Sequence, residues 1–99
     1  MRIVLYSKDK CTYCSKSKVM LDNLGLKYTE KKFENFDSVE SFKKDIGKDV
    51  RTIPQIKING ELIGGYHQLV EYLDDQGLVN FKGEKVDQKK KQHNTVSRN

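Results

Sequence analysis

Residues 3–14 read IVLYSKDKCTYC, and this stretch decides the fold. The short apolar run over 2–6 predicts a buried strand, and the polar residues 7–10 predict a turn. From Thr12 the apolar spacing becomes that of a helix, which we expect to end at Gly25 with a glycine cap. The two cysteines, Cys11 and Cys14, therefore lie at the junction between the predicted first strand and the predicted first helix.

The remaining elements follow from the same kind of spacing. We expect further strands over 26–33, 55–58 and 61–63, and helices over 37–46 and 66–73. Asp37 is the expected cap of the second helix, with Glu40 reaching back, and Gly47 is its expected end. The dipeptide Asn59-Gly60 predicts a tight hairpin turn. The apolar faces of the first two helices are expected at Val19, Met20 and Leu24 and at Val39, Phe42 and Ile46, respectively.

This order of elements predicts an α/β fold. The early strand–helix–strand unit implies parallel pairing with a right-handed crossover, and the late hairpin is antiparallel. A four-stranded mixed sheet flanked by helices on both faces accounts for residues 1 to about 76. We expect one domain over 1–77 and a basic, flexible C-terminal tail over 78–99.

The charge of the chain is concentrated at its C-terminal end. The 99 residues carry a net charge of +5 and are 33% charged and 35% hydrophobic. Residues 81–99 hold six basic and two acidic residues, whereas the first 80 hold 13 basic and 12 acidic ones. A nucleic-acid partner is not expected for the nearly neutral body, and docking through the tail lysines around Lys85 to Lys91 is kept as an alternative.

The N-terminal end predicts where the protein works. No apolar run approaches the ~18 residues that cross a bilayer, and the run at 2–6 is too short for a signal peptide. We therefore expect a cytoplasmic protein without a membrane partner. Two cysteines three residues apart would close too small a loop to stabilise a secreted domain, so the pair is expected to do chemistry.

The position of Cys11 at a helix start predicts a reactive thiolate. Free N–H groups of the first turn, the helix dipole and the neighbouring Lys8 and Lys10 would all stabilise its negative charge and lower its pKa from ~8.5. Cys14 lies one turn further in and should be more buried, so Cys11 attacks and Cys14 resolves. Zinc is the competing interpretation, but only His67 and His93 could complete four ligands, and no metal is expected.

Two further segments point to a binding site. Pro54, the only proline, precedes an apolar strand. It is either an ordinary proline at a strand start or part of a cis peptide with Ile53 that turns backbone groups toward Cys11. Gly64 and Gly65 are either a simple break or a place where a ligand approaches the backbone before a helix N-terminus.

The segments YSKDKCTYC, RTIPQIKING and GGYHQL, in this order and spacing, together resemble the glutaredoxin family over roughly residues 1–73. The resemblance implies the thioredoxin-like three-layer fold and dithiol thiol–disulfide oxidoreductase activity. It implies reduction of glutathione mixed disulfides and protein disulfides, with glutathione as electron donor. Thr12 stands where proline is common in the family, and Gln68 where many members have an acidic residue.

The resemblance also assigns roles to individual positions. Cys11 matches the nucleophile and Cys14 the resolving cysteine. The implied glutathione contacts are Lys8, Tyr13, Thr52, Ile53, Pro54, Gly65, Tyr66, His67 and Gln68. Ribonucleotide reductase is a possible protein substrate at the level of the family, and we expect a monomer. The alternative function is a carrier of a glutathione-ligated [2Fe–2S] cluster shared by two protomers.

Overall fold

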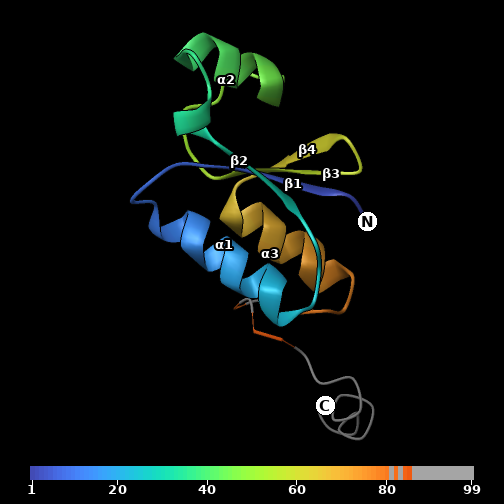
Figure 1. Cartoon of the computed structure of the whole chain (residues 1–99). Coiled ribbons are helices and arrows are strands. Elements are labelled where there is room, and N and C mark those ends of the chain that lie inside the picture. Colours follow the sequence, from blue (N-terminus) through green and yellow to red (C-terminus); the bar gives the residue numbers. More distant parts are fainter. Residues whose placement is uncertain (81, 83, 86–99) are drawn as a thin grey trace, which may run out of the picture.

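The computed structural model describes residues 1–80, 82, 84 and 85. Its elements follow the expected order, with one short 3₁₀ helix in addition (Figure 1). They are β1 (Ile3–Ser7), α1 (Thr12–Asn23), β2 (Thr29–Lys32), η1 (Phe33–Asn35), α2 (Val39–Ile46), β3 (Gln55–Ile58), β4 (Glu61–Gly64) and α3 (Tyr66–Asp75).

The four strands form one mixed sheet in the order β2-β1-β3-β4. β1 pairs with β2 in parallel and with β3 antiparallel, and β3 pairs with β4 antiparallel. The hairpin turn between β3 and β4 has positive φ at both Asn59 (53°) and Gly60 (86°), which the Asn-Gly pair accommodates at low cost. Helices α1 and α3 lie side by side on one face of the sheet, and α2 lies on the other side (Figure 1). The predicted three-layer arrangement is confirmed.

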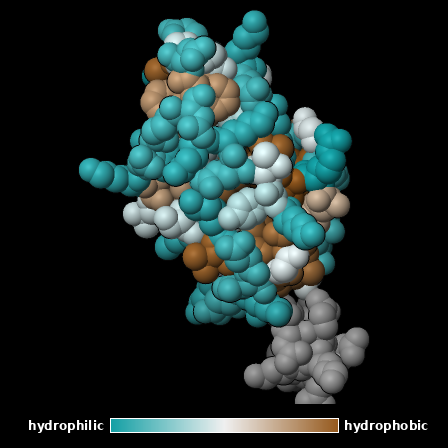
Figure 2. Space-filling view, viewed as in Figure 1, coloured by the Kyte–Doolittle hydropathy of each residue, from teal (hydrophilic) through white to brown (hydrophobic). Residues whose placement is uncertain are grey.

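The larger core fills the layer between the sheet and helices α1 and α3. It is built from side chains that are fully buried, among them Leu5, Leu21, Ile56, Leu69 and Leu73. Figure 2 shows a mainly hydrophilic surface in which hydrophobic residues appear between α1 and α3. This core holds the second half of α1 against the sheet through Met20 and Leu21, and Cys14 and Ser17 are buried nearer the start of the helix.

A smaller, aromatic core holds α2 on the opposite face. Phe42 is 4% exposed and makes edge-to-face contacts with Tyr6, Phe33 and Phe36, at centroid distances of 5.9, 5.2 and 5.0 Å. Ile46 is the other buried side chain of α2. Because Phe33 and Phe36 come from the segment between β2 and α2, this cluster ties three parts of the chain together.

Polar contacts to Asp45 complete the attachment of α2. The hydroxyl of Tyr6 donates to the carboxylate of Asp45 at 2.8 Å, and its oxygen lies 3.1 Å from the backbone carbonyl of the same residue. Lys31 pairs with the same carboxylate at 3.0 Å, and Lys57 donates to the carbonyl at 2.9 Å. The hydrogen bonds from Tyr6 and Lys31 hold the pKa of Asp45 below its ordinary value, while burial raises the pKa of Tyr6.

Some predicted details of the helices are wrong. Val19 is 57% exposed and Val39 is 47% exposed, and the fully buried Leu21 takes the place expected for Val19 in the core. The cap of α2 is Ser38, whose hydroxyl accepts from the backbone nitrogen of Ser41 while the Ser41 hydroxyl accepts from that of Ser38. The predicted pair Asp37 and Glu40 therefore does not cap this helix.

The end of the described chain continues the packing of the core. Val79 is 1% exposed and belongs to the larger core. It also forms an isolated antiparallel bridge with Lys85. Most of the basic tail predicted over 78–99 lies outside the described residues.

Candidate active site

The two cysteines lie at the N-terminus of α1 and form a disulfide. Cys11 is the residue that caps the helix, with extended backbone (φ −117°), and Cys14 lies in its first turn. Cys14 is 2% exposed, whereas Cys11 is partly exposed. The expected difference in burial is therefore present in the structure, and a reagent in solvent reaches Cys11 more readily than Cys14.

The first turn of α1 directs an N–H group at the sulfur of Cys11. The backbone nitrogen of Cys14 donates to Sγ of Cys11 at 3.1 Å, as the sequence predicts for one of the first-turn nitrogens. Just behind this turn, the buried hydroxyl of Ser17 donates to the carbonyl of Tyr13 at 2.8 Å. After reduction, the same N–H group would stabilise a thiolate at Cys11.

The peptide bond between Ile53 and Pro54 is cis, which decides between the two interpretations of Pro54. Sγ of Cys11 lies 3.7 Å from the carbonyl oxygen of Ile53. A disulfide sulfur carries no proton, so this approach is a contact and not a hydrogen bond. It brings a segment 42 residues away in sequence directly beside the reactive sulfur.

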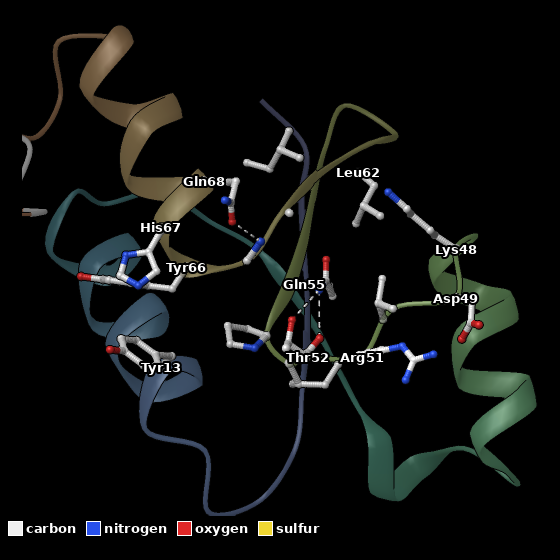
Figure 3. A pocket seen from close by; sticks show the side chains of 16 residues that line it. Tyr13, Lys48, Asp49, Arg51, Thr52, Gln55, Leu62, Tyr66, His67 and Gln68 are labelled. Atoms are coloured by element: carbon white, nitrogen blue, oxygen red, sulfur yellow. Dashed lines mark hydrogen bonds between the residues drawn. The ribbon is translucent and has the colours of Figure 1, made fainter.

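A surface groove of about 540 Å³ opens next to this contact. Its walls come from the start of α1, the segment between α2 and β3, and the junction of β4 with α3. Figure 3 shows aromatic side chains at one end of the groove, Thr52 and Gln55 in its middle, and charged side chains at the other end. It brings together eight of the predicted glutathione contacts: Tyr13, Thr52, Ile53, Pro54, Gly65, Tyr66, His67 and Gln68.

The aromatic end of the groove is a cluster of three rings. Tyr13 lies 5.3 Å from Tyr66 and 5.5 Å from His67 between ring centroids, and Tyr66 lies 5.5 Å from His67. The Lys16 ammonium lies 5.2 Å from the centroid of the Tyr13 ring. Tyr13 is 44% exposed, so the cluster offers a ring face to a bound molecule.

The junction of β4 and α3 forms the wall of the groove near Gln68. Gln68 Oε1 accepts from the backbone nitrogen of Gly65 at 2.9 Å, a contact visible in Figure 3. Gly64 has φ +120°, and a Cβ there would lie 2.8 Å from Cγ of Gln68. Glycine at position 64 is thus required both by the backbone and by the close approach of Gln68. The N–H groups of Tyr66 and His67 at the first turn of α3 lie in the same wall.

The middle of the groove is braced by Gln55, which sequence reasoning missed. Its side chain is buried, at 6% exposed, and its Nε2 donates to the carbonyl of Thr52 at 2.9 Å and approaches the Thr52 hydroxyl at 3.3 Å. This bond fixes the backbone of the segment that precedes Pro54. The sequence signal for this role was the side-chain amide of Gln55, directly after Pro54 at the start of a strand.

The charged end of the groove was also missed. Lys48, Asp49 and Arg51 line it, all of them exposed. They follow α2 in a loop whose position depends on how that helix packs, so their neighbours could not be read from spacing. Lys8, in contrast, does not line the groove and lines another cavity together with Cys11.

Among residues 1–80, 82, 84 and 85, no group of three or more His, Cys, Asp or Glu side chains is placed to hold a metal ion. In the same part of the chain, every helix is too short or too polar to span a bilayer.

Comparison with known proteins agrees with this geometry. The glutaredoxin family model matches residues 3–63. Glutaredoxin 1 of Rickettsia conorii is 36% identical over 80 residues, covering 78% of this chain and 76% of the relative. The crystal structure of a buckwheat glutaredoxin–glutathione complex superposes with a TM-score of 0.67 at 30% identity, covering 80% of this chain and 74% of that one. Glutaredoxin 1 from Francisella tularensis, complexed with cacodylate, gives a TM-score of 0.64 at 25% identity over 78% of this chain and 95% of that one.

The disulfide at the start of α1, the cis proline beside it and the adjoining groove thus occur in a chain with glutaredoxin sequence and glutaredoxin structure. On these grounds the chain belongs to the glutaredoxin family and is a thiol–disulfide oxidoreductase.

Proposed function

We propose that this protein reduces glutathione mixed disulfides and protein disulfides, with glutathione as the electron donor and Cys11 as the attacking group. The observation that carries the proposal is the surroundings of Cys11. Its sulfur accepts an N–H bond from Cys14 and touches the carbonyl of Ile53, at the edge of a groove of suitable size for a tripeptide. The glutathione bound in the buckwheat structure gives further support.

The proposed reaction begins with the reduced enzyme. The Cys11 thiolate attacks the glutathionyl sulfur of a protein–glutathione disulfide, which joins glutathione to Cys11 and releases the protein thiolate. A second glutathione thiolate then attacks the glutathionyl sulfur on Cys11, which frees Cys11 and forms glutathione disulfide. The net reaction therefore consumes one glutathione, and the other half of the glutathione disulfide comes from the substrate.

A protein disulfide would be reduced by a different second step. Cys11 attacks one sulfur of the substrate and forms a mixed disulfide with it, and the thiolate of Cys14 then attacks Cys11. The substrate leaves as a dithiol, and the enzyme is left with the Cys11–Cys14 disulfide seen in the structure. Two glutathione molecules reduce that disulfide and complete the cycle.

The groove supplies the proposed contacts to glutathione. The backbone groups of Ile53 at the cis peptide are placed to pair with an extended peptide as an added strand would. The first turn of α3, at Tyr66 and His67, offers N–H groups to a carboxylate. Gln68 is next to this turn and can accept a hydrogen bond from the glutathione amino group through the second lone pair of its Oε1.

A glutathione-coupled assay with two cysteine variants tests the proposal. With a glutathionylated peptide as substrate, Cys11→Ser should abolish turnover, whereas Cys14→Ser should keep a substantial part of it because glutathione itself completes that reaction. With a protein disulfide as substrate, both variants should lose activity. Turnover by Cys11→Ser, or equal loss of peptide turnover in both variants, would contradict the assignment. We also propose that the protein works in a glutathione-rich reducing compartment, as expected of the cytoplasm.

A further inference from the structure

A further surface cavity, of about 530 Å³, is lined by Cys11 and shares no lining residue with the groove. We call it the lysine cavity, because its lining includes Lys8, Lys10, Lys18 and Lys32. Both cysteines also line it, whereas neither of them lines the groove. Among the described residues that line the lysine cavity, Asp9 is the one carboxylate.

The four lysines differ in how far their charge is already neutralised. Lys18 Nζ lies 3.1 Å from Oε2 of Glu30, and the Ser7 hydroxyl donates to the same oxygen at 2.6 Å. This hydrogen bond is the main cause of the lowered pKa of Glu30, so the carboxylate stays charged and Lys18 stays paired. Lys18 is therefore already paired and has little charge to offer a ligand.

The charge available to a ligand lies at the other three lysines. Lys32 Nζ lies 3.5 Å from Asp9 in a pair whose side chains are 42% and 65% exposed, and such a pair is easily exchanged for another partner. Lys8 and Lys10 are exposed, and in the described part of the chain neither of them forms an ion pair. The cavity thus presents exposed ammonium groups beside the redox-active sulfurs.

A disulfide substrate has two limbs, one on each sulfur. In the proposed function the glutathionyl limb occupies the groove at Ile53 and Gly65. The protein limb is then excluded from the groove, and the lysine cavity is a cavity that Cys11 itself lines. Residues that flank the substrate cysteine would therefore meet exposed ammonium groups, which attract carboxylates and repel cations.

We infer that the lysine cavity is a specificity site that selects protein substrates with acidic residues next to the reactive cysteine. Lys10 and Lys32 carry this selection. The inference rests on the proposed function, because it assigns the second limb of the same substrate. It adds a substrate class to that function, namely acidic cysteine-containing segments of proteins.

The test compares two glutathionylated peptides that differ only in their flanks, one with Asp and Glu and one with Ser and Gln. We expect kcat/KM to favour the acidic peptide by about five-fold or more at low salt, and the preference to shrink toward one at high ionic strength. The double variant Lys10→Gln with Lys32→Gln should reduce the preference below about two-fold at low salt. Because Lys10 is also expected to stabilise the Cys11 thiolate, its loss should slow both peptides alike, so the result is the ratio of the two kcat/KM values on the same enzyme. Turnover of a small uncharged mixed disulfide of glutathione measures the loss that is common to all substrates.

Lys27→Gln is the matched control. Lys27 is exposed and follows the far end of α1, about 18 Å of helix away from Cys11, and its replacement removes the same kind of charge. It should leave the preference intact. A wild-type enzyme that turns over the uncharged substrate but does not prefer the acidic peptide would overturn the inference and leave the proposed function standing. A preference that survives in the double variant, or falls equally in Lys27→Gln, would also overturn it. Absence of turnover with every glutathionylated substrate would instead refute the proposed function and the inference with it.

Discussion

The backbone nitrogen of Cys14 lies 3.1 Å from Sγ of Cys11 and donates its hydrogen to that sulfur. In the reduced protein the same N–H group and the N-terminal end of α1 would favour the thiolate. We therefore expect Cys11 to be alkylated at neutral pH at least about ten-fold faster than Cys14, with a thiol pKa below ~8.5. The rate of alkylation against pH, measured on Cys14→Ser for Cys11 and on Cys11→Ser for Cys14, checks this. Equal rates and ordinary pKa values for both thiols would contradict it.

Gln68 offers a way to strengthen glutathione binding. Replacement by Glu keeps an oxygen that can accept from Gly65, and it adds a negative charge at the start of α3 and near the proposed position of the glutathione amino group. We expect Gln68→Glu to lower the KM for glutathione by about five-fold, since a charge-assisted hydrogen bond contributes about 1 kcal/mol more than a neutral one.

The matched control for this change is Gln68→Ala, which removes the acceptor for the Gly65 nitrogen. It should raise the KM for glutathione and lower the free energy of unfolding by about 1 kcal/mol. If Glu and Ala gave the same KM, Gln68 would not contact glutathione.

Asp45 is expected to make stability depend on pH. Its pKa in the folded protein is held below the ordinary value of 3.8 by the hydrogen bonds from Tyr6 and Lys31. The unfolded chain therefore binds the proton first as the pH falls, so the stabilisation is complete above pH 3.8 and is lost as the pH falls through the lower, folded value. Asp45→Asn should cost about 1 kcal/mol at neutral pH, a modest value because the carboxylate and Lys31 are 35% and 40% exposed.

Urea unfolding at several pH values measures this effect. The difference between wild type and Asp45→Asn should shrink as the pH is lowered below 3.8. Asp49→Asn serves as a control, because Asp49 is 77% exposed in its pair with Lys43 and its replacement should have little effect. A difference that stays constant with pH would refute the electrostatic explanation.

Phe42 is expected to determine whether α2 stays on the sheet. It contacts three aromatic rings and is 4% exposed, so Phe42→Ala should lower the free energy of unfolding by about 3 kcal/mol. Val39→Ala, one turn earlier on the exposed side of the same helix, should change it by less than about 0.5 kcal/mol. Thermal unfolding of the two variants distinguishes them. Equal losses would mean that α2 does not depend on the aromatic core.

The sequence predicts the elements and the centre of the site because local chemistry dictates them. A cysteine pair after a strand, a lone proline before another and a glycine pair before a helix each constrain only the residues around them. Their mutual placement followed from the family resemblance, and the structure brings them together at Ile53 and Cys11. The hairpin at Asn59 was predictable for the same local reason, since its dihedral angles suit that residue pair.

Features that depend on long-range packing could not be read from spacing. Val19 and Leu21 are both apolar residues of one helix, and the orientation of α1 against α3 decides that Leu21 is buried and Val19 is not. Asp37 and Ser38 can both cap a helix, and the tertiary position of the chain selects Ser38. The position of the charged end of the groove depends in turn on the packing of α2, because Lys48 and Arg51 lie in the loop that follows this helix.

The attachment of α2 has a consequence for how the molecule opens. This helix buries two of its own side chains, whereas α1 and α3 share the larger core. It should therefore behave as a separate cooperative unit, whose amide hydrogens exchange with solvent at a lower free energy than those of the other helices. Such an opening would dismantle the Lys48–Arg51 side of the groove and leave the redox pair, anchored on the opposite layer, in place.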